Sequence, residues 1–304
     1  MKAVLLTEYG GIDKLVFRED QPEPEVEAGQ VKVRVTSASI NPIDWKLRSG
    51  HAKAIMPLQL PAILGRDAAG EVDAVGDGVS NFRQGDRVMG LVFGAYAEFV
   101  VAPAEAWAKL PAGLDTKDAG ALPLVVLTGD QLVDATLEGS QGEGRTLLVT
   151  GAVGAVGRVA VFVAKRRGAR VLAGVRGKQV SEAEKLGADG VVALDDESAL
   201  TRLLTLDCIA DTVGGPTIGK LLSKVKPGGV IGSVVGEPQD AKSRGLTVHA
   251  FLARPNSQRL GELGCAVAHG HFSIPIGKRF PLHEAGAAQE LAEAGGVGKV
   301  LLVP

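Results

Sequence analysis

The sequence predicts an α/β protein that combines a doubly wound parallel sheet with a second, β-rich domain, and three observations support this. From about residue 125, short apolar strands alternate with helical spans, as in a parallel sheet covered by helices on both faces. Before that point, alternating runs separated by glycine and proline favour a compact barrel-like domain. A turn with evenly spaced glycines follows the first strand of the parallel region.

Length and composition exclude several classes of protein. The chain has 304 residues, enough for two domains with their own cores, and a net charge of −2. That charge predicts no nucleic-acid or acidic-membrane surface. The N-terminus does not resemble a signal peptide, and no run approaches the ~20 apolar residues of a membrane span. We therefore expect a cytoplasmic protein that binds neither nucleic acid nor membrane.

The first domain is expected to comprise residues 1–124 and to be completed by a C-terminal segment from about 265 to 304. Strands that are half buried are predicted at 31–35, 71–75 and 86–90, where apolar and charged residues alternate. A helix over 283–294 and a strand over 300–303 are predicted in the segment that returns to this domain.

The second domain is expected to comprise residues 125–264. It begins with a helical segment near residue 125 and continues with strands separated by helices. The predicted strands lie near 147–150, 170–175, 190–194, 206–211 and 230–235, with a sixth at 246–251. Their apolar character predicts a sheet buried on both faces.

The strand near 147–150 leads into a glycine-rich turn. Gly151, Gly154 and Gly157 are spaced three apart, and a helix over 158–167 follows. This order begins a dinucleotide-binding βαβ unit, in which the helix N-terminus faces the phosphates of the cofactor. The residues expected to contact the cofactor here are Gly151, Ala152, Val153, Gly154, Ala155, Val156 and Gly157.

The following strand indicates which dinucleotide is bound. NAD sites place an acidic residue on the ribose roughly 20 residues after the turn, but no acidic residue occurs between Gly157 and Glu182. Arg176 and Lys178 instead follow the strand that contains Gly174, where a 2′-phosphate would lie. The sequence therefore predicts NADPH. The alternative is that these two cations are solvated residues of a surface loop.

Motifs along the whole chain carry a family resemblance. They lie at 39–46, 64–72, 82–88, 119–128, 185–189, 211–215 and 226–229, together with the glycine turn. With these motifs the chain resembles the medium-chain dehydrogenase/reductase superfamily, and within it the zinc-free quinone oxidoreductase (zeta-crystallin-like) and 2-alkenal reductase branch. The resemblance implies a Rossmann domain and a GroES-like catalytic domain.

The resemblance also implies a site without zinc. Zinc-dependent relatives have Cys about where Asn41 stands and His-Glu about where Arg66 and Asp67 stand, and Asn and Arg are not usual zinc ligands. The cofactor would then deliver hydride to a quinone or an α,β-unsaturated carbonyl. The protein would hold the acceptor and stabilise the oxyanion that develops on it.

The candidate catalytic residues follow the strand at 31–35. Asn41 is a candidate amide donor toward the nicotinamide ribose or the substrate oxygen, or else a turn residue before Pro42. Lys46 is the preferred oxyanion donor, and because several quinone-reducing relatives have Tyr nearby, it favours enals and enones. Asp44 either holds a neighbouring side chain or serves a loop or helix cap.

The family also implies cofactor contacts away from the glycine turn. Thr128 matches a position that contacts the cofactor in relatives. Val235 and Gly236, at the carboxyl end of the fifth strand, are expected near the nicotinamide, with an ordinary strand end as the alternative. Lys299 is expected to be structural.

Two further expectations concern activity and assembly. The leading hypothesis is an NADPH-dependent reductase of small-molecule quinones, enals or enones. The alternative is an NADPH-binding sensor or structural protein with little or no turnover. A homodimer is expected, because relatives often pair through the edge strand of the cofactor sheet, here 246–251.

Overall fold

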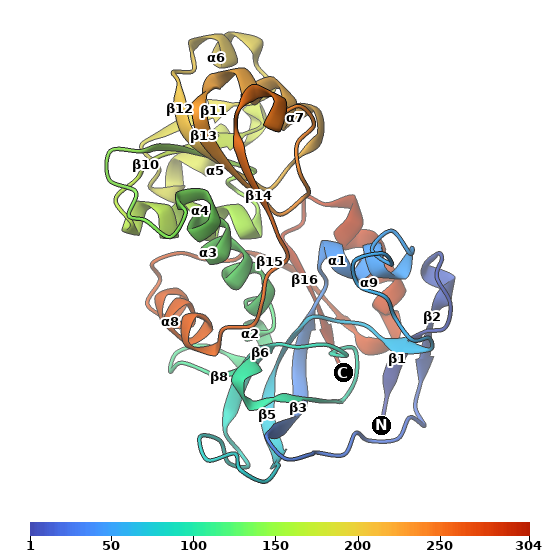
Figure 1. Ribbon diagram of the computed structural model, residues 1–304. Coiled ribbons are helices and arrows are strands. Elements are labelled where there is room, and N and C mark those ends of the chain that lie inside the picture. The colour runs from blue at the N-terminus through green and yellow to red at the C-terminus, as the bar shows by residue number, and fades with distance from the viewer. The chain divides into compact units, whose positions relative to one another are not determined.

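A computed structural model describes all residues, Met1–Pro304, and the chain divides into two units (Figure 1). The first unit comprises Met1–Leu124 and Pro255–Pro304, and the second comprises Val125–Arg254. The chain returns to the first unit at Pro255, earlier than the expected position near residue 265. The reason is that helix α8 (Ser257–Ala268) packs against strand β8 (Trp107–Lys109) of the first unit.

The first unit is rich in strands. In chain order it contains β1 (Ala3–Leu6), β2 (Leu15–Arg18), β3 (Gln30–Ser39), α1 (Pro42–Arg48), β4 (Ala62–Ile63), β5 (Asp67–Val75), β6 (Arg87–Leu91), β7 (Phe99–Pro103), β8, α2 (Thr116–Ala119), α8, β15 (Ile276–Pro281), α9 (Ala285–Ala294) and β16 (Lys299–Val303).

The second unit alternates strands and helices, following α3 (Pro123–Leu137), whose first two residues belong to the first unit. It contains β9 (Thr146–Thr150), α4 (Ala155–Arg166), β10 (Arg170–Val175), α5 (Val180–Ala183), β11 (Gly190–Ala193), α6 (Glu197–Arg202), β12 (Leu206–Asp211), α7 (Gly215–Leu221), β13 (Val225–Ser233) and β14 (Thr247–Ala250).

Strand β3 is the centre of the first unit's larger sheet, whose order is β15-β16-β3-β5-β6-β8. It pairs antiparallel with β5 along its length, with β7 through its first half and with β16 through its last residues. Val31, Val33 and Val35 are buried, whereas Lys32 and Arg34 between them are not. The alternation in the sequence thus identified a strand with one face in the core.

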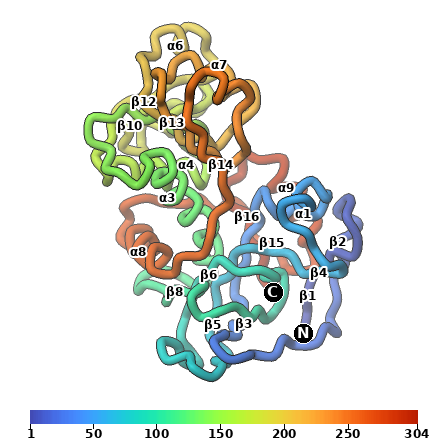
Figure 2. Tube along the Cα trace, in the orientation of Figure 1, coloured from blue at the N-terminus to red at the C-terminus, as the bar shows by residue number.

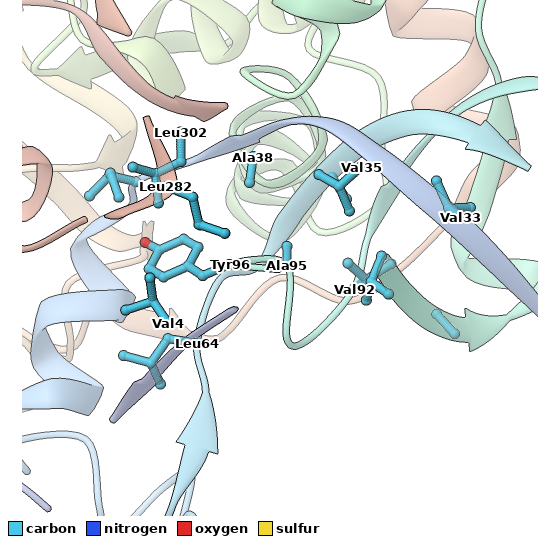
Figure 3. Packing of buried hydrophobic residues seen from close by; sticks show 14 of the residues in the cluster. Val4, Val33, Val35, Ala38, Leu64, Val92, Ala95, Tyr96, Leu282 and Leu302 are labelled. Atoms are coloured by element: carbon cyan, nitrogen blue, oxygen red, sulfur yellow. The ribbon is translucent and has the colours of Figure 1, made fainter. Parts of the chain in front are cut away.

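The C-terminal segment completes the core of the first unit. Leu282 and Leu302 belong to the same apolar cluster as Val33 and Val35 of β3 (Figure 3). Helix α9 contacts α1, and both traces show the red end of the chain beside the blue beginning (Figures 1 and 2). Residues more than 200 positions apart in the sequence therefore lie in the same core.

The second unit contains a six-stranded sheet in which every pair is parallel, in the order β11-β10-β9-β12-β13-β14. Leu147, Leu148 and Val149 of the central strand β9 are all buried, as expected for a strand covered on both faces. The predicted fold class is confirmed. None of the helices combines the length and apolar character of a membrane-spanning segment.

Candidate functional site

The glycine turn after β9 requires glycine at defined positions. Gly151 has a φ of +64°, a backbone conformation that favours glycine. A Cβ atom at Gly157 would lie 2.2 Å from the carbonyl oxygen of Gly151. The helix α4 therefore approaches the end of β9 more closely than any residue with a side chain would allow.

The start of α4 presents backbone N–H groups in the way that a dinucleotide requires. The helix begins at Ala155, with Gly154 as its N-cap, and its first N–H groups have no partners within the helix. No side chain caps them. The open N-terminus carries a partial positive charge. The turn and helix thus fit the diphosphate of a dinucleotide cofactor.

A buried carboxylate organises the carboxyl ends of the neighbouring strands. Asp211, at the end of β12, accepts a hydrogen bond of 2.7 Å from the hydroxyl of Thr150 and one of 3.4 Å from that of Ser233. Its Oδ1 also accepts from the backbone N–H groups of Val213 and Gly214, each at 3.1 Å. One side chain thereby fixes the ends of β9, β12 and β13 and the loop beside them.

Apolar side chains are exposed at this same edge of the sheet. Val213 is 48% exposed and Val235 is 40% exposed, although both follow buried strands. Gly236 has a φ of +106°, so the chain turns sharply after Val235. In parallel sheets this edge is where ligands bind. The structure therefore places Val235 and Gly236 where the sequence expects nicotinamide contacts, and these contacts stay a prediction.

The loop after β10 carries the two cations expected to hold a 2′-phosphate. Arg176 and Lys178 are both exposed, and neither side chain makes an ion pair within the protein. Gly174 is buried just before them, and a Cβ there would lie 2.9 Å from Leu194. Asp195 lies beside the same loop and accepts a hydrogen bond of 2.7 Å from the Gly177 N–H. The acidic residue thus binds backbone and leaves both cations free.

Thr128 lies on α3 in the second unit and is buried, with an exposed fraction of 8%. Thr128 forms no hydrogen bond to the glycine turn or to the loop that contains Arg176. Its proposed contact with the cofactor stays a prediction that rests on the family resemblance.

In the first unit, Asp67 is the centre of a buried polar cluster. Its Oδ2 accepts hydrogen bonds from the Ser39 hydroxyl and, at 2.8 Å, from the Asn41 side-chain amide. Its Oδ1 accepts from the Leu124 N–H at 2.6 Å. The Lys299 ammonium lies 3.9 Å from Oδ2. A carboxylate with no exposed surface is stable here because each oxygen is paired.

Asn41 is committed to this cluster on both sides of its amide. Its Nδ2 donates to Asp67 and to Ser39, while its Oδ1 accepts a hydrogen bond of 2.7 Å from Lys299. Only 1% of Asn41 is exposed. In this arrangement the amide holds β3, β5 and β16 together rather than offering a free N–H. The expected donor role toward ribose or substrate would require Asn41 to leave these partners.

Lys299 is buried and structural, as expected. Besides Asn41, its ammonium donates to the carbonyl of Ile40 at 2.8 Å. Burial lowers its pKa, and the nearby carboxylates of Asp67 and Asp44 oppose that shift. The buried cation and the Asp67 carboxylate therefore balance each other in the interior.

Asp44 stabilises the start of α1, one of the two roles considered for it. Its Oδ2 accepts hydrogen bonds from the Asn41 N–H at 2.7 Å and from the Tyr96 hydroxyl at 2.9 Å. Its Oδ1 is buried without a partner. Burial raises the pKa of Asp44 to about 7, against the lowering effect of these two hydrogen bonds. Figure 3 shows Tyr96 among Val4 and Leu64, deep in the apolar cluster.

The structure does not bring Lys46 into this cluster. Lys46 lies on α1 two residues after Asp44, and its side chain is exposed without an ion pair. Residues two apart point to different sides of a helix, so Asp44 faces inward and Lys46 outward. Sequence reasoning assigned no role to Ser39, Asp67, Tyr96 or Asp211. The alternation of β3 and β5 predicts burial at such positions but does not identify their partners.

Two profiles of known families match the chain. Residues 27–112 match the family described as alcohol dehydrogenase GroES-like domain, and residues 186–302 match the one described as zinc-binding dehydrogenase. The 2-haloacrylate reductase of Burkholderia sp is 30% identical over 336 residues, covering 99% of this chain and 98% of that protein. The chloroplastic NADPH-dependent alkenal/one oxidoreductase of Arabidopsis thaliana is 27% identical over 319 residues, covering 100% and 80%.

Solved structures agree over the whole chain. The quinone oxidoreductase from Coxiella burnetii superposes with a TM-score of 0.88 at 30% identity, covering 100% of this chain and 99% of that one. A mycobacterial protein solved with NADPH gives 0.85 at 28% identity, covering 100% of both. The chain belongs to the medium-chain dehydrogenase/reductase superfamily. Within it, this protein is a reductase of the quinone oxidoreductase-like kind.

One of the two matched families is described as a zinc-binding dehydrogenase, so the side chains that could bind a metal ion in this chain are relevant. The structure contains no group of three or more His, Cys, Asp or Glu side chains placed to hold a metal ion. Cys208 is buried and Cys265 is exposed, and both are free. Asn41 and Asp67 instead bind the ammonium of Lys299, so these side chains do not present a set of zinc ligands.

Replacing Gly157 by Ala should disturb the glycine turn. The added methyl would overlap the Gly151 carbonyl, and overpacking of this kind costs about 1–3 kcal/mol. We expect the dissociation constant for NADPH to rise by about fivefold to a hundredfold, measured by isothermal titration calorimetry. Gly219→Ala is the control, because a Cβ on this exposed glycine of α7 meets no atom. Equal NADPH binding by both variants would contradict the close approach.

Replacing Asp44 by Asn should change how stability depends on pH. The folded-state pKa of about 7 exceeds the ordinary value of about 4, so protonated Asp44 favours folding. This contribution is present below pH 4 and is lost as the pH rises to 7. Relative to the variant, the wild-type protein should lose on the order of 2 kcal/mol of unfolding free energy between pH 5 and pH 8.

Urea unfolding of both proteins at pH 5 and pH 8 measures this difference. Taking the difference between wild type and variant removes the titration of all other groups. Asn keeps an oxygen that accepts from Asn41 and Tyr96, so the fold should survive. A difference that is the same at both pH values would show that Asp44 does not have a raised pKa.

Proposed function

We propose that the protein is an NADPH-dependent oxidoreductase that transfers hydride to a quinone or an α,β-unsaturated carbonyl without a zinc ion. The observation that carries this proposal is the combination of the open α4 N-terminus with the unpaired cations Arg176 and Lys178. The first suits a diphosphate and the second suits the additional phosphate of NADPH. Relatives whose names specify NADPH support the same cofactor.

Different residues of the chain would bind different parts of NADPH. The N–H groups at the start of α4 would hold the diphosphate, while Arg176 and Lys178 would hold the 2′-phosphate. Val213 and Val235 would pack against the nicotinamide end, because apolar surface exposed at a ligand-binding edge favours an aromatic ring. When bound, NADPH supplies the hydride, so the protein needs to orient the acceptor and stabilise its oxygen.

The residues available in the first unit support the proposed class of acceptor. Asn41 and Lys299 bind each other. Neither side chain is therefore free to activate an alcohol, as a strong acid or a bound metal ion would. A conjugated carbonyl or quinone needs neither, because conjugation spreads the developing negative charge onto its own oxygen. Lys46 stays a candidate donor to that oxygen, since its exposed ammonium has no partner in the protein.

Consumption of NADPH tests the proposal directly. Purified protein is mixed with NADPH or NADH and then with 1,4-benzoquinone or a short 2-alkenal. We expect NADPH to be oxidised in a one-to-one ratio with at least one acceptor, and faster than NADH. Tight NADPH binding with no turnover on any quinone, enal or enone would instead support the sensor or structural role.

Replacing Arg176 by Ala should weaken the binding of NADPH but not that of NADH. A charge-assisted hydrogen bond contributes about 1.5–3 kcal/mol, so the KM for NADPH should rise about tenfold or more. The KM for NADH should stay within about twofold, because NADH lacks the 2′-phosphate. Steady-state kinetics with both cofactors measure the difference.

Lys185→Ala provides the matched control for Arg176→Ala. Lys185 is also exposed, belongs to the same unit and makes no ion pair. It should leave the KM for NADPH unchanged, which separates the local contact from the loss of one positive charge. Equal losses for NADPH and NADH in Arg176→Ala would contradict the assignment of the 2′-phosphate.

We further propose that the protein is a homodimer. Strand β14 is at the edge of the parallel sheet and pairs only with β13, so its outer hydrogen-bonding groups are available to a second chain. Light scattering should give twice the chain mass of 31.3 kDa. A mass of one chain at micromolar concentration would contradict this proposal.

A further inference from the structure

Arg66 is a half-buried cation with few partners in the protein. It lies between β4 and β5, immediately before Asp67. The one hydrogen bond of its guanidinium runs from Nη1 to the sulfur of Met56 at 3.6 Å, and Nε is buried with no acceptor. A guanidinium offers five N–H donors, and a thioether is a weak acceptor. The Nη2 group has no partner in the protein and is not enclosed as Nε is, so Nη2 remains available to a ligand and Nε does not.

The surroundings of Arg66 combine this charge with apolar surface. The guanidinium lies 5.8 Å from the ring centroid of Phe93, which is 39% exposed. Ile55, next to Met56, is 65% exposed. An exposed aromatic ring beside a cation without an ion pair is a feature of a small-ligand site rather than of a core.

The nearby carboxyl groups do not neutralise Arg66. Asp67 is paired with Lys299, and Asp44 has a pKa of about 7, so it carries only part of a charge at neutral pH. Both favour the charged form of Arg66, while burial lowers its pKa. Neither forms an ion pair with it. A half-buried cation without an ion pair would be stabilised by a bound anion.

We propose that Arg66 binds the carboxylate of an α,β-unsaturated acid, with the alkene of this acceptor against Phe93 and Met56. This inference rests on the proposed function and narrows its substrate class. A planar guanidinium matches a carboxylate through two parallel hydrogen bonds. The hydride of NADPH would go to the β-carbon and a proton from water to the α-carbon, giving the saturated acid and NADP⁺, with the carboxylate unchanged.

A matched pair of acceptors tests the charge requirement. 2-Chloroacrylate and its methyl ester have the same alkene but differ in charge. We expect Arg66→Met to lower kcat/KM for the acid by about tenfold or more while changing that for the ester by less than twofold. Arg66→Lys should retain part of the activity on the acid. Equal losses on acid and ester would overturn the proposal.

A binding measurement separates this proposal from the proposed function. 2-Chloropropionate is the saturated product and cannot accept hydride, so its binding by calorimetry does not depend on turnover. Binding to wild type that is lost in Arg66→Met would support the anion site even if no acceptor oxidises NADPH. Absence of binding to the wild-type protein would overturn the anion site, whatever the turnover on neutral enones.

Arg87→Met provides the control variant. Arg87 is an exposed cation on β6 of the same unit, so its replacement changes the net charge by the same amount. It should leave both acceptors and the binding of 2-chloropropionate unchanged. Thermal unfolding of each variant shows whether it is folded, and Arg66→Lys keeps the test valid if Arg66→Met is not.

Discussion

The buried carboxylate of Asp67 is the interaction on which the first unit depends. It has no exposed surface, and it joins Ser39 of β3, Asn41 before α1 and the N–H of Leu124, with Lys299 of β16 nearby. These residues are far apart in the chain, so the carboxylate can form these hydrogen bonds only when the sheet is complete. Loss of Lys299 would leave this buried carboxylate without its counter-charge, which is costly.

The second unit uses the same device for a different purpose. Asp211 joins Thr150 and Ser233 at the carboxyl ends of adjacent parallel strands and also holds the loop at Val213. This arrangement fixes the edge at which parallel sheets of this kind bind their ligands. In each unit, then, a buried carboxylate holds the strand ends beside the proposed ligand contacts, which remain at the surface.

The sequence predicted the features that depend on local spacing. The glycine turn, the alternation in β3 and the run of parallel strands are each specified within a few residues. The cluster around Asp67 was not predicted, because Asn41 and Lys299 are 258 positions apart. Asp195 was also missed, since it comes from the end of the next strand. Its position beside Gly177 arises from the pairing of β10 with β11.

The catalytic candidates show a further limit of sequence reasoning. Asn41 was predicted to be an amide donor or a turn residue, and Asp44 to hold a neighbouring side chain or serve a loop or helix cap. Helix α1 begins at Pro42 and turns Asp44 inward, where it binds Tyr96. The same helix turns Lys46 outward. A list of residue types cannot separate these roles, because the direction of each side chain depends on where the helix begins.

Isotope transfer tests the central claim, which is metal-free hydride transfer from NADPH to a conjugated acceptor. The protein is first dialysed against a metal chelator and then incubated with an enone and NADPH deuterated at C4 on the transferring face. The account predicts one deuterium at the β-carbon of the product, detected by mass spectrometry, with no loss of rate after chelation. Unlabelled product, or activity that chelation abolishes and zinc restores, would contradict it.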